Sequence, residues 1–215
     1  MKLDNIYLLH HTDFKYRKNK IENRLLEENV KLEWVENYLP NDIDYEKELI
    51  NHEVFEDIDI IHPYGIYRNF SKKISINSLS LVLKHLWCYK DQLLNNYENV
   101  LILEDDVEII PNFNDYLDNV MIEFNKLKTE NNVEMVMLGT SHSFTAKKTE
   151  NNFIHYNEHQ KTRCTHAYIV NISATKKIVE KFTNINLPID FKLNEIIQIT
   201  NIKVAWAEPG LKQIS

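Results

Sequence analysis

The sequence predicts an α/β fold in which a single Rossmann-like, mostly parallel sheet is flanked by helices. Short apolar segments alternate along the chain with amphipathic segments of helical period, an order typical of parallel βαβ units. Residues 100–103 are apolar at every position, as expected of a central strand covered on both faces. No linker rich in Gly, Ser or Pro divides the 215 residues, so we expect one domain over residues 1–215.

The first part of the chain predicts a strand, a helix and a second strand. Residues 6–9 form a short apolar run typical of a buried strand, and residues 31–35 alternate apolar and charged side chains. Residues 15–29 between them have a helical period. The apolar positions of this period are Ile21, Leu25 and Leu26. Residues 36–74 show no clear period and are expected to be irregular or partly helical, walling or covering a site.

The middle of the chain contains the clearest helix, over residues 77–94, with Asn77 and Ser78 as candidate N-caps. Strand 100–103 follows. Pro111 and Asn112 then introduce a helix that ends near Lys128. Residues 134–138 read as the next buried strand, which Gly139 closes.

The last part of the chain begins with residues 141–163, which are polar and are expected to form a loop. A strand over residues 166–170 and a helix from Ser173 to Phe182 follow, with Ser173 as the cap. Pro188 precedes a short helix over residues 190–199. A final strand covers residues 202–207.

Composition excludes several classes of function. The net charge of −7 argues against a nucleic-acid partner. Only three glycines occur, which excludes a glycine-rich phosphate loop. Two cysteines are too few for a disulfide framework. No apolar run approaches the ~20 residues that span a bilayer, and the first residues are too polar for a signal peptide, so we expect a cytoplasmic protein without a membrane span.

The acidic triplet Glu104, Asp105 and Asp106 directly follows strand 100–103. Ligands of open α/β sheets bind at the carboxyl ends of the strands, so these carboxylates lie where a ligand is expected. Oxygen ligands suit Mn²⁺ or Mg²⁺, and such an ion could neutralise a diphosphate leaving group. A helix cap or a solvated loop is the alternative. The triplet alone does not separate a transferase from a phosphatase or a nuclease.

The segment Ser-Leu-Val-Leu-Lys-His-Leu-Trp at 80–87, followed by Val-Leu-Ile-Leu-Glu-Asp-Asp-Val at 100–107, resembles glycosyltransferase family 25, which includes lipooligosaccharide and procollagen galactosyltransferases. Further matches follow the order of the family. They are Tyr-Leu-Leu at 7–9, Arg17, Met-Leu-Gly-Thr at 137–140, Thr-His-Ala-Tyr-Ile at 165–169 with Ala174 and Lys176, Pro-Ile-Asp at 188–190, and Glu-Pro-Gly-Leu-Lys-Gln at 208–213. Lys84 stands where the family has serine, and Asn77 and Ser80 stand near positions that are commonly glycine. These departures bear on the preference for donor or acceptor.

The resemblance implies a GT-A fold and an inverting, metal-dependent transfer of a hexose, galactose or glucose, from a UDP-sugar to a glycan or hydroxylysine-type peptide acceptor. The donor site would lie mainly in residues 1–140, and the acceptor side in residues 141–215 with 36–74. The resemblance also implies roles for individual residues. Asp106, Asp105 and His166 would hold the metal, Mn²⁺ or Mg²⁺, and the donor would contact Glu104, Asp105, Arg17, His85 and Gln213.

Asp190 is the candidate general base, because a carboxylate in a late loop after Pro188 could reach the acceptor hydroxyl; its alternative is to cap a helix. His166 and His85 have the alternative of filling the core, Arg17 that of a surface ion pair, and Gln213 that of closing the fold. The pair His10-His11 is set aside as a metal site, since adjacent side chains of a strand point to opposite faces.

Two other functions compete with the transferase. One is a non-catalytic nucleotide-sugar or carbohydrate-binding module with the same fold, against which the retention of all three carboxylates argues. The other is a metal-dependent phosphohydrolase, against which the lack of a second acidic cluster at a strand end argues.

Overall fold

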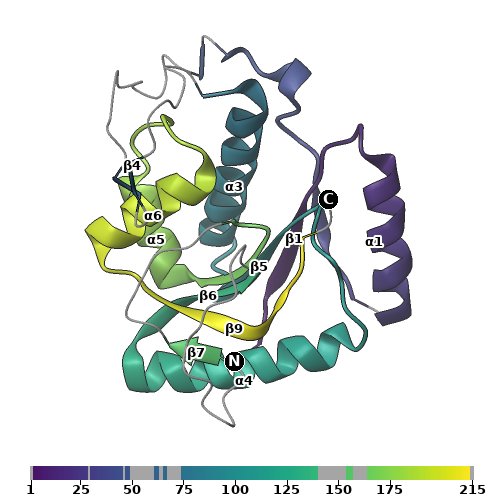
Figure 1. Ribbon diagram of the computed structural model, residues 1–215, viewed down its shortest axis with the longest axis vertical. Helices are drawn as coiled ribbons and strands as arrows, with labels where there is room; N and C mark the ends of the chain where they lie inside the picture. Colours follow the sequence, from purple (N-terminus) through teal and green to yellow (C-terminus); the bar gives the residue numbers. More distant parts are fainter. Residues whose placement is uncertain are drawn as a thin grey trace.

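The computed structural model describes residues 2–28, 30–45, 47–48, 61–62, 65–66, 74–139, 154–156 and 164–213. Its centre is a seven-stranded sheet of order β2-β1-β5-β8-β6-β9-β7 (Figure 1). The strands are β1 Asn5–Leu9, β2 Glu33–Val35, β5 Asn99–Glu104, β6 Val133–Gly139, β7 Ile154–Tyr156, β8 Ala167–Asn171 and β9 Lys203–Leu211, with β3 Ile61–His62 and β4 Gly65–Ile66 in a separate antiparallel pair. The helices are α1 Lys15–Glu28, α3 Ile76–Leu94, α4 Phe113–Asn131, α5 Ile172–Lys181, α6 Ile189–Thr200 and the short 3₁₀ helix η1 Pro40–Asp42.

The predicted α/β fold is confirmed. The pairs β1–β2, β1–β5 and β6–β9 are parallel, whereas β8 runs antiparallel to β5 and β6, and β7 antiparallel to β9. Five strands of the described sheet therefore share one direction. Because β8 runs against them, its first residues lie at the same edge as the last residues of β1, β5 and β6. This edge gathers the candidate site.

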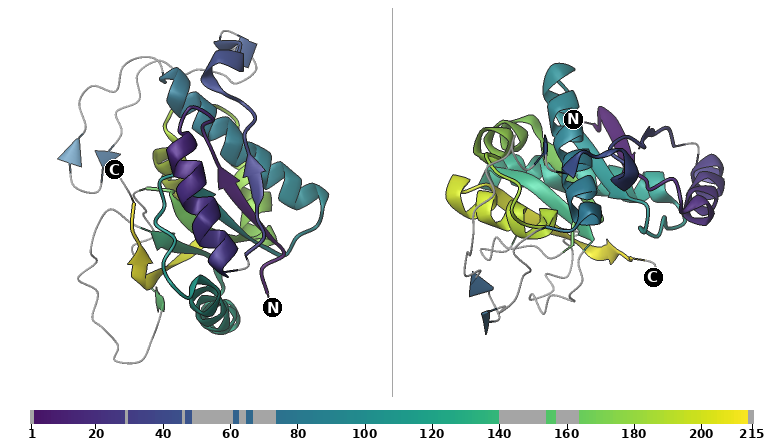
Figure 2. Two further views of the ribbon diagram at one scale, coloured as in Figure 1. Left: turned by 90° about the vertical axis from the view of Figure 1, so that its right-hand side faces the viewer. Right: turned by 90° about the horizontal axis from the view of Figure 1, so that it is seen from above.

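Two apolar cores cover the two faces of the sheet, because successive side chains of a strand point to opposite faces. Helices α3, α5 and α6 pack over one face, where Tyr7, Ile102 and Tyr168 are buried. Helices α1 and α4 pack over the other face, where Leu8 and Leu101 are buried. Figure 2 shows α1 crossing in front of the strands. Strand β5 is buried at every position except its last residue, Glu104, so the chain reaches the surface at the acidic triplet.

The helix caps differ from the prediction. The hydroxyl of Ser75 accepts the Ser78 N–H at 3.2 Å and caps α3, two residues before the first of the predicted caps, Asn77. The Asn171 side chain accepts the Ala174 N–H at 2.8 Å and caps α5 in place of Ser173. Both errors have one cause, since several neighbouring residues could cap each helix and only the direction of the incoming chain selects one.

Other predictions changed at the surface. Leu26, expected on the buried face of α1, is 79% exposed, because that helix covers the sheet with Ile21 and Leu25. Residues 154–156, expected in a loop, pair with β9 as an edge strand. Most of the rest of segments 36–74 and 141–163 lies outside the described residues. Among the described helices, none has the length and apolar character needed to cross a membrane.

Candidate active site

The acidic triplet borders a pocket of about 200 Å³ at the carboxyl edge of the sheet. The ends of β1 and β5 and the first turns of α1 and α3 line it. Three carboxylates face two basic side chains here. They are Glu104, Asp105 and Asp106, against Arg17 and Lys84. The lining therefore carries one excess negative charge, which a divalent cation would reverse.

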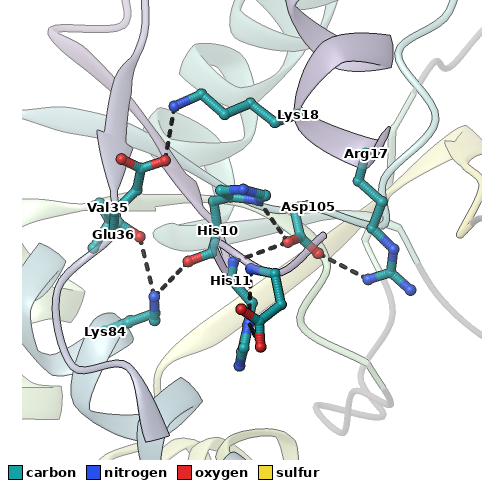
Figure 3. Close-up of polar contacts among 9 residues, drawn as sticks. His10, His11, Arg17, Lys18, Val35, Glu36, Lys84 and Asp105 are labelled. Carbon is teal, nitrogen blue, oxygen red and sulfur yellow. Dashed lines mark hydrogen bonds and ion pairs between the residues drawn. The ribbon is translucent and has the colours of Figure 1, made fainter. Parts of the chain in front are cut away.

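Asp105 is buried and hydrogen bonded through both of its carboxylate oxygens (Figure 3). Its Oδ2 lies 2.8 Å from His10 Nδ1 and accepts the His11 N–H at 3.0 Å, and its Oδ1 accepts from Arg17 Nη1 at 2.9 Å. These contacts tie the end of β5 to the end of β1 and to the first turn of α1. The guanidinium of Arg17 is thus paired with the carboxylate of Asp105, and Asp105 is the residue that connects the three elements at this edge of the sheet.

Asp106, the next residue, has the opposite environment. Its Oδ2 accepts from Gln213 Nε2 at 2.6 Å, while its Oδ1 is buried and has no hydrogen-bond partner in the described part of the chain. Burial raises the pKa of this carboxyl, and the charge of Glu104 adds to the rise, although Gln213, His166 and Arg17 oppose it. A buried acceptor without a donor is costly, so this oxygen is suited to a cation.

His166 provides a second buried atom without a partner. The ring is 1% exposed, its Nε2 lies 3.2 Å from the carbonyl oxygen of Leu211, and its Nδ1 has no hydrogen-bond partner among the described residues. The ring lies over Gly139, where an added Cβ would come within 1.9 Å of Nε2. The glycine at the end of β6 therefore makes room for this imidazole.

The three predicted metal ligands are not gathered into one cluster. Within the described residues, no group of three or more His, Cys, Asp or Glu side chains is arranged to hold a metal ion. Asp106 and His166 are near enough for the imidazole to affect the pKa of the carboxyl, whereas Asp105 is engaged by His10, His11 and Arg17. The donor set that fits a cation is thus one carboxylate oxygen and one imidazole nitrogen.

Glu104 is held by a hydrogen-bonded chain that runs into the core. Its Oε1 accepts from Thr165 Oγ1 at 2.6 Å and lies 3.3 Å from His85 Nε2. His85 Nδ1 lies 2.7 Å from the hydroxyl of Tyr168, which lies 2.6 Å from that of Tyr89. An ionised carboxylate only accepts, so Nε2 carries the hydrogen and Tyr168 donates to Nδ1. His85 thereby orients the Glu104 carboxylate from the side of the protein core.

Asp190 lies in the first turn of α6 and faces the same edge of the sheet. Its carboxylate accepts the Phe191 N–H at 2.9 Å and is also hydrogen bonded to the backbone of Cys164, just before β8. Burial raises the pKa of Asp190, and the negative charge of Glu104 raises it further. The structure therefore brings the candidate base to the Glu104 side of the site.

Three contributors were missed by sequence reasoning. His10 reaches Asp105 because it directly follows β1, and the ammonium of Lys84 lies 2.5 Å from the carbonyl oxygen of that same histidine. Thr165 reaches Glu104 because β8 is antiparallel. The position of His10 after a strand was a usable signal. The contacts of Lys84 and Thr165 depend on packing and strand direction, which no local pattern reports.

One family model covers most of the chain. Residues 4–193 match the family model described as glycosyltransferase family 25 (LPS biosynthesis protein). No curated protein sequence matches the chain significantly. Among solved structures, the chain is similar to a glycosyltransferase involved in the glycosylation of the major capsid of PBCV-1. The identity is 11% and the TM-score 0.47, over 95% of this chain and 82% of that one.

Proposed function

Because the chain belongs to glycosyltransferase family 25, we propose that it transfers a hexose, galactose or glucose, from a UDP-sugar to a glycan or hydroxylysine-type acceptor, with inversion at the anomeric carbon. Family membership implies a transferase, and the nature of donor, acceptor and mechanism is our proposal. The observation that carries it is a pair of buried atoms without hydrogen-bond partners among the described residues, Asp106 Oδ1 and His166 Nδ1, and Asp106 also lines the pocket.

A divalent cation, Mn²⁺ or Mg²⁺, fits the residues on this side of the triplet. Asp106 and His166 would hold it, and oxygens of the donor diphosphate and water would complete its shell. When bound, the ion would offset the negative charge that develops on the leaving diphosphate. The two engaged oxygens of Asp105 favour a positioning role for this residue over the role of metal ligand.

The proposed transfer is a single displacement. The acceptor hydroxyl oxygen forms a bond to the anomeric carbon while the bond from that carbon to the β-phosphate oxygen breaks. The proton of the hydroxyl passes to the base, and UDP leaves with the electron pair. Asp190 supports this step as the base, since its raised pKa lets the carboxylate hold the proton better than an ordinary aspartate.

Glu104 and Gln213 would border the donor from opposite sides of Asp106. Gln213 donates to Asp106 Oδ2, so it holds this carboxylate in one orientation. Glu104 is held by Thr165 and His85, and its fixed position suits a contact with a sugar or ribose hydroxyl. We place the donor mainly on residues 1–140, and the acceptor on residues 141–215 with 36–74.

The first experiment measures UDP release from a panel of UDP-sugars in the presence of Mn²⁺ and sugar or hydroxylysine-peptide acceptors. The wild-type protein should release UDP, and a chelator should stop the release. Asp106→Ala should lower the rate about 100-fold or more, since the several kcal/mol that a cation contributes to a transition state equal two or more decades in rate.

The matched control is Asp118→Ala, which removes an exposed aspartate of α4 that does not line the pocket. It should release UDP at the wild-type rate. Absence of both binding and turnover with every UDP-sugar would refute the proposed function. Binding of UDP-sugars with Mn²⁺, without transfer to any acceptor, would support a nucleotide-sugar-binding module instead.

A further inference from the structure

Lys84 is a buried cation whose partners are neutral. It lies in α3, and its side chain is 3% exposed. Its Nζ donates to the carbonyl oxygen of His10 at 2.5 Å and to that of Val35 at 3.3 Å, at the ends of β1 and β2 (Figure 3). Lysine is rarely buried this fully without an ion-pair partner, and among the described residues no carboxylate lies within ion-pair distance of it.

The ammonium group has capacity for one more ligand. It carries three N–H donors, and two of them go to the carbonyl oxygens of His10 and Val35. In the described part of the chain no third acceptor is present. Lys84 also lines the pocket beside the acidic triplet, so the remaining donor belongs to a group that borders a cavity.

The group is a cation under ordinary conditions. Burial lowers the pKa of Lys84 to about 8, while the charges of Asp105 and Glu36 act against this decrease from a distance. The positive charge and the two carbonyl contacts fix the ammonium at the end of the sheet where β1 and β2 meet. The remaining partner must therefore be an oxygen or nitrogen with a lone pair, and an anionic oxygen would compensate the buried charge best.

We propose that Lys84 is a donor-binding residue, whose ammonium donates a hydrogen bond to an oxygen of the donor nucleotide. This inference rests on the proposed function and adds to it the residue that holds the nucleotide on the β1–β2 side of the pocket. Arg17 lines the same pocket but is paired with Asp105, so among the described lining residues Lys84 is the cation that remains available to the ligand. The oxygen can belong to a phosphate or to the uracil and ribose.

The test is the affinity of Lys84→Met for UDP, UMP and uridine in the presence of Mn²⁺, measured by titration calorimetry. Methionine has a similar length and no charge. We expect Kd for UDP to rise about 10-fold or more, as the loss of one charge-assisted hydrogen bond implies. If the variant loses affinity for UDP and UMP but not for uridine, Lys84 contacts a phosphate oxygen. If it loses affinity equally for all three ligands, Lys84 contacts an oxygen of the nucleoside.

The matched control is Lys18→Met. Lys18 lies near the same strands, but it pairs with Glu36 at 2.7 Å and is not part of the pocket lining. Its variant should bind UDP as the wild type does. An unchanged Kd for UDP in a folded Lys84→Met would overturn the inference while leaving the proposed function standing. Failure of the wild type itself to bind UDP or any UDP-sugar would instead remove the proposed function.

A second measurement does not depend on the folding of a variant. The Nζ and Cε resonances of Lys84 are followed by NMR in the wild-type protein as UDP is added. A bound oxygen should shift both resonances at saturation, with those of Lys18 as the internal reference. The inference would be contradicted if calorimetry showed that UDP binds to the wild type while the Lys84 resonances did not shift. This result would decide the question even if Lys84→Met did not fold.

Discussion

The two sides of the acidic triplet differ although their carboxylates are neighbours in sequence. On the Asp105 side, His10, the backbone of His11 and Arg17 occupy both oxygens. On the Asp106 side, the Oδ1 atom of Asp106 and the Nδ1 atom of His166 are buried and have no hydrogen-bond partner in the described residues. The contacts of the first side are typical of a structural hub, and the buried polar atoms of the second side suit a cation.

This difference shows how one short motif can serve two purposes. Asp105 ties three elements together, so its contribution is to the folded state of the protein. Asp106 has a raised pKa and, among the described residues, one carboxylate oxygen without a hydrogen-bond partner, so its ionised form costs stability when no cation is bound. The cost of the second carboxylate is tolerable because the contacts of the first hold the edge of the sheet in place.

The largest expected effect follows from Gly139→Ala, which disturbs only the side of the triplet that contains Asp106 and His166. The new Cβ would lie 1.9 Å from Nε2 of His166, so the ring must move. We expect metal affinity to fall about 10–100-fold, as for other losses of ligand orientation, and the free energy of unfolding to fall by about 1–3 kcal/mol from overpacking. Calorimetric Mn²⁺ titration and urea unfolding measure the two quantities.

Gly210→Ala is the matched control for this substitution. Its Cβ would meet the Leu138 carbonyl oxygen at 3.2 Å, which needs an adjustment of only a few tenths of an ångström. It should change the free energy of unfolding by less than about 1 kcal/mol, as a mild contact does. If Gly139→Ala bound Mn²⁺ as tightly as this control, His166 would have no part in holding the ion.

The Asp105 side of the triplet is tested by the substitution Asp105→Asn. The substitution removes the charge that Arg17 and His10 contact, so the free energy of unfolding should fall by about 1–3 kcal/mol, the range for hydrogen bonds to charged groups. Urea unfolding without metal measures the change, and Asp118→Asn is the exposed control. A stability equal to that of the wild type would mean that Asp105 is not the hub inferred from its contacts.

The smallest effect has the opposite sign and concerns Asp106→Asn in metal-free protein. The folded-state pKa of Asp106 is raised. Its contribution to stability is therefore fully present below the ordinary aspartate pKa and is lost as the pH rises through the raised value. The variant should be more stable than the wild type at pH 7, and the difference should vanish on acidification. Thermal unfolding from pH 3 to 7 measures this difference. A variant less stable than the wild type at pH 7 would show that the carboxylate has a partner.

The sequence predicted the parts of this molecule that depend on local patterns. The apolar run before Glu104 located both the central strand β5 and the edge where the site lies. The direction of β8 was beyond such patterns, because an apolar run reads the same in either direction. The contact between Thr165 and Glu104 was therefore not predicted. Lys84 was noted only as a residue that differs from the family pattern, and the structure shows it as a buried cation in the pocket lining.

The reversed strand β8 has a consequence for how this fold can diversify. Strand β6 ends at Gly139 and β8 begins at Ala167, with the edge strand β7 between them in sequence, and β2 ends at Val35 whereas α3 begins at Ile76. All four of these anchors lie near one edge, where the acidic triplet sits. Insertions or exchanges next to these four anchors, outside β7, would alter the surroundings of the acidic triplet without breaking a strand pair of the seven-stranded sheet. The architecture thus allows the surroundings of the acidic triplet to vary while the strands that position the triplet stay the same.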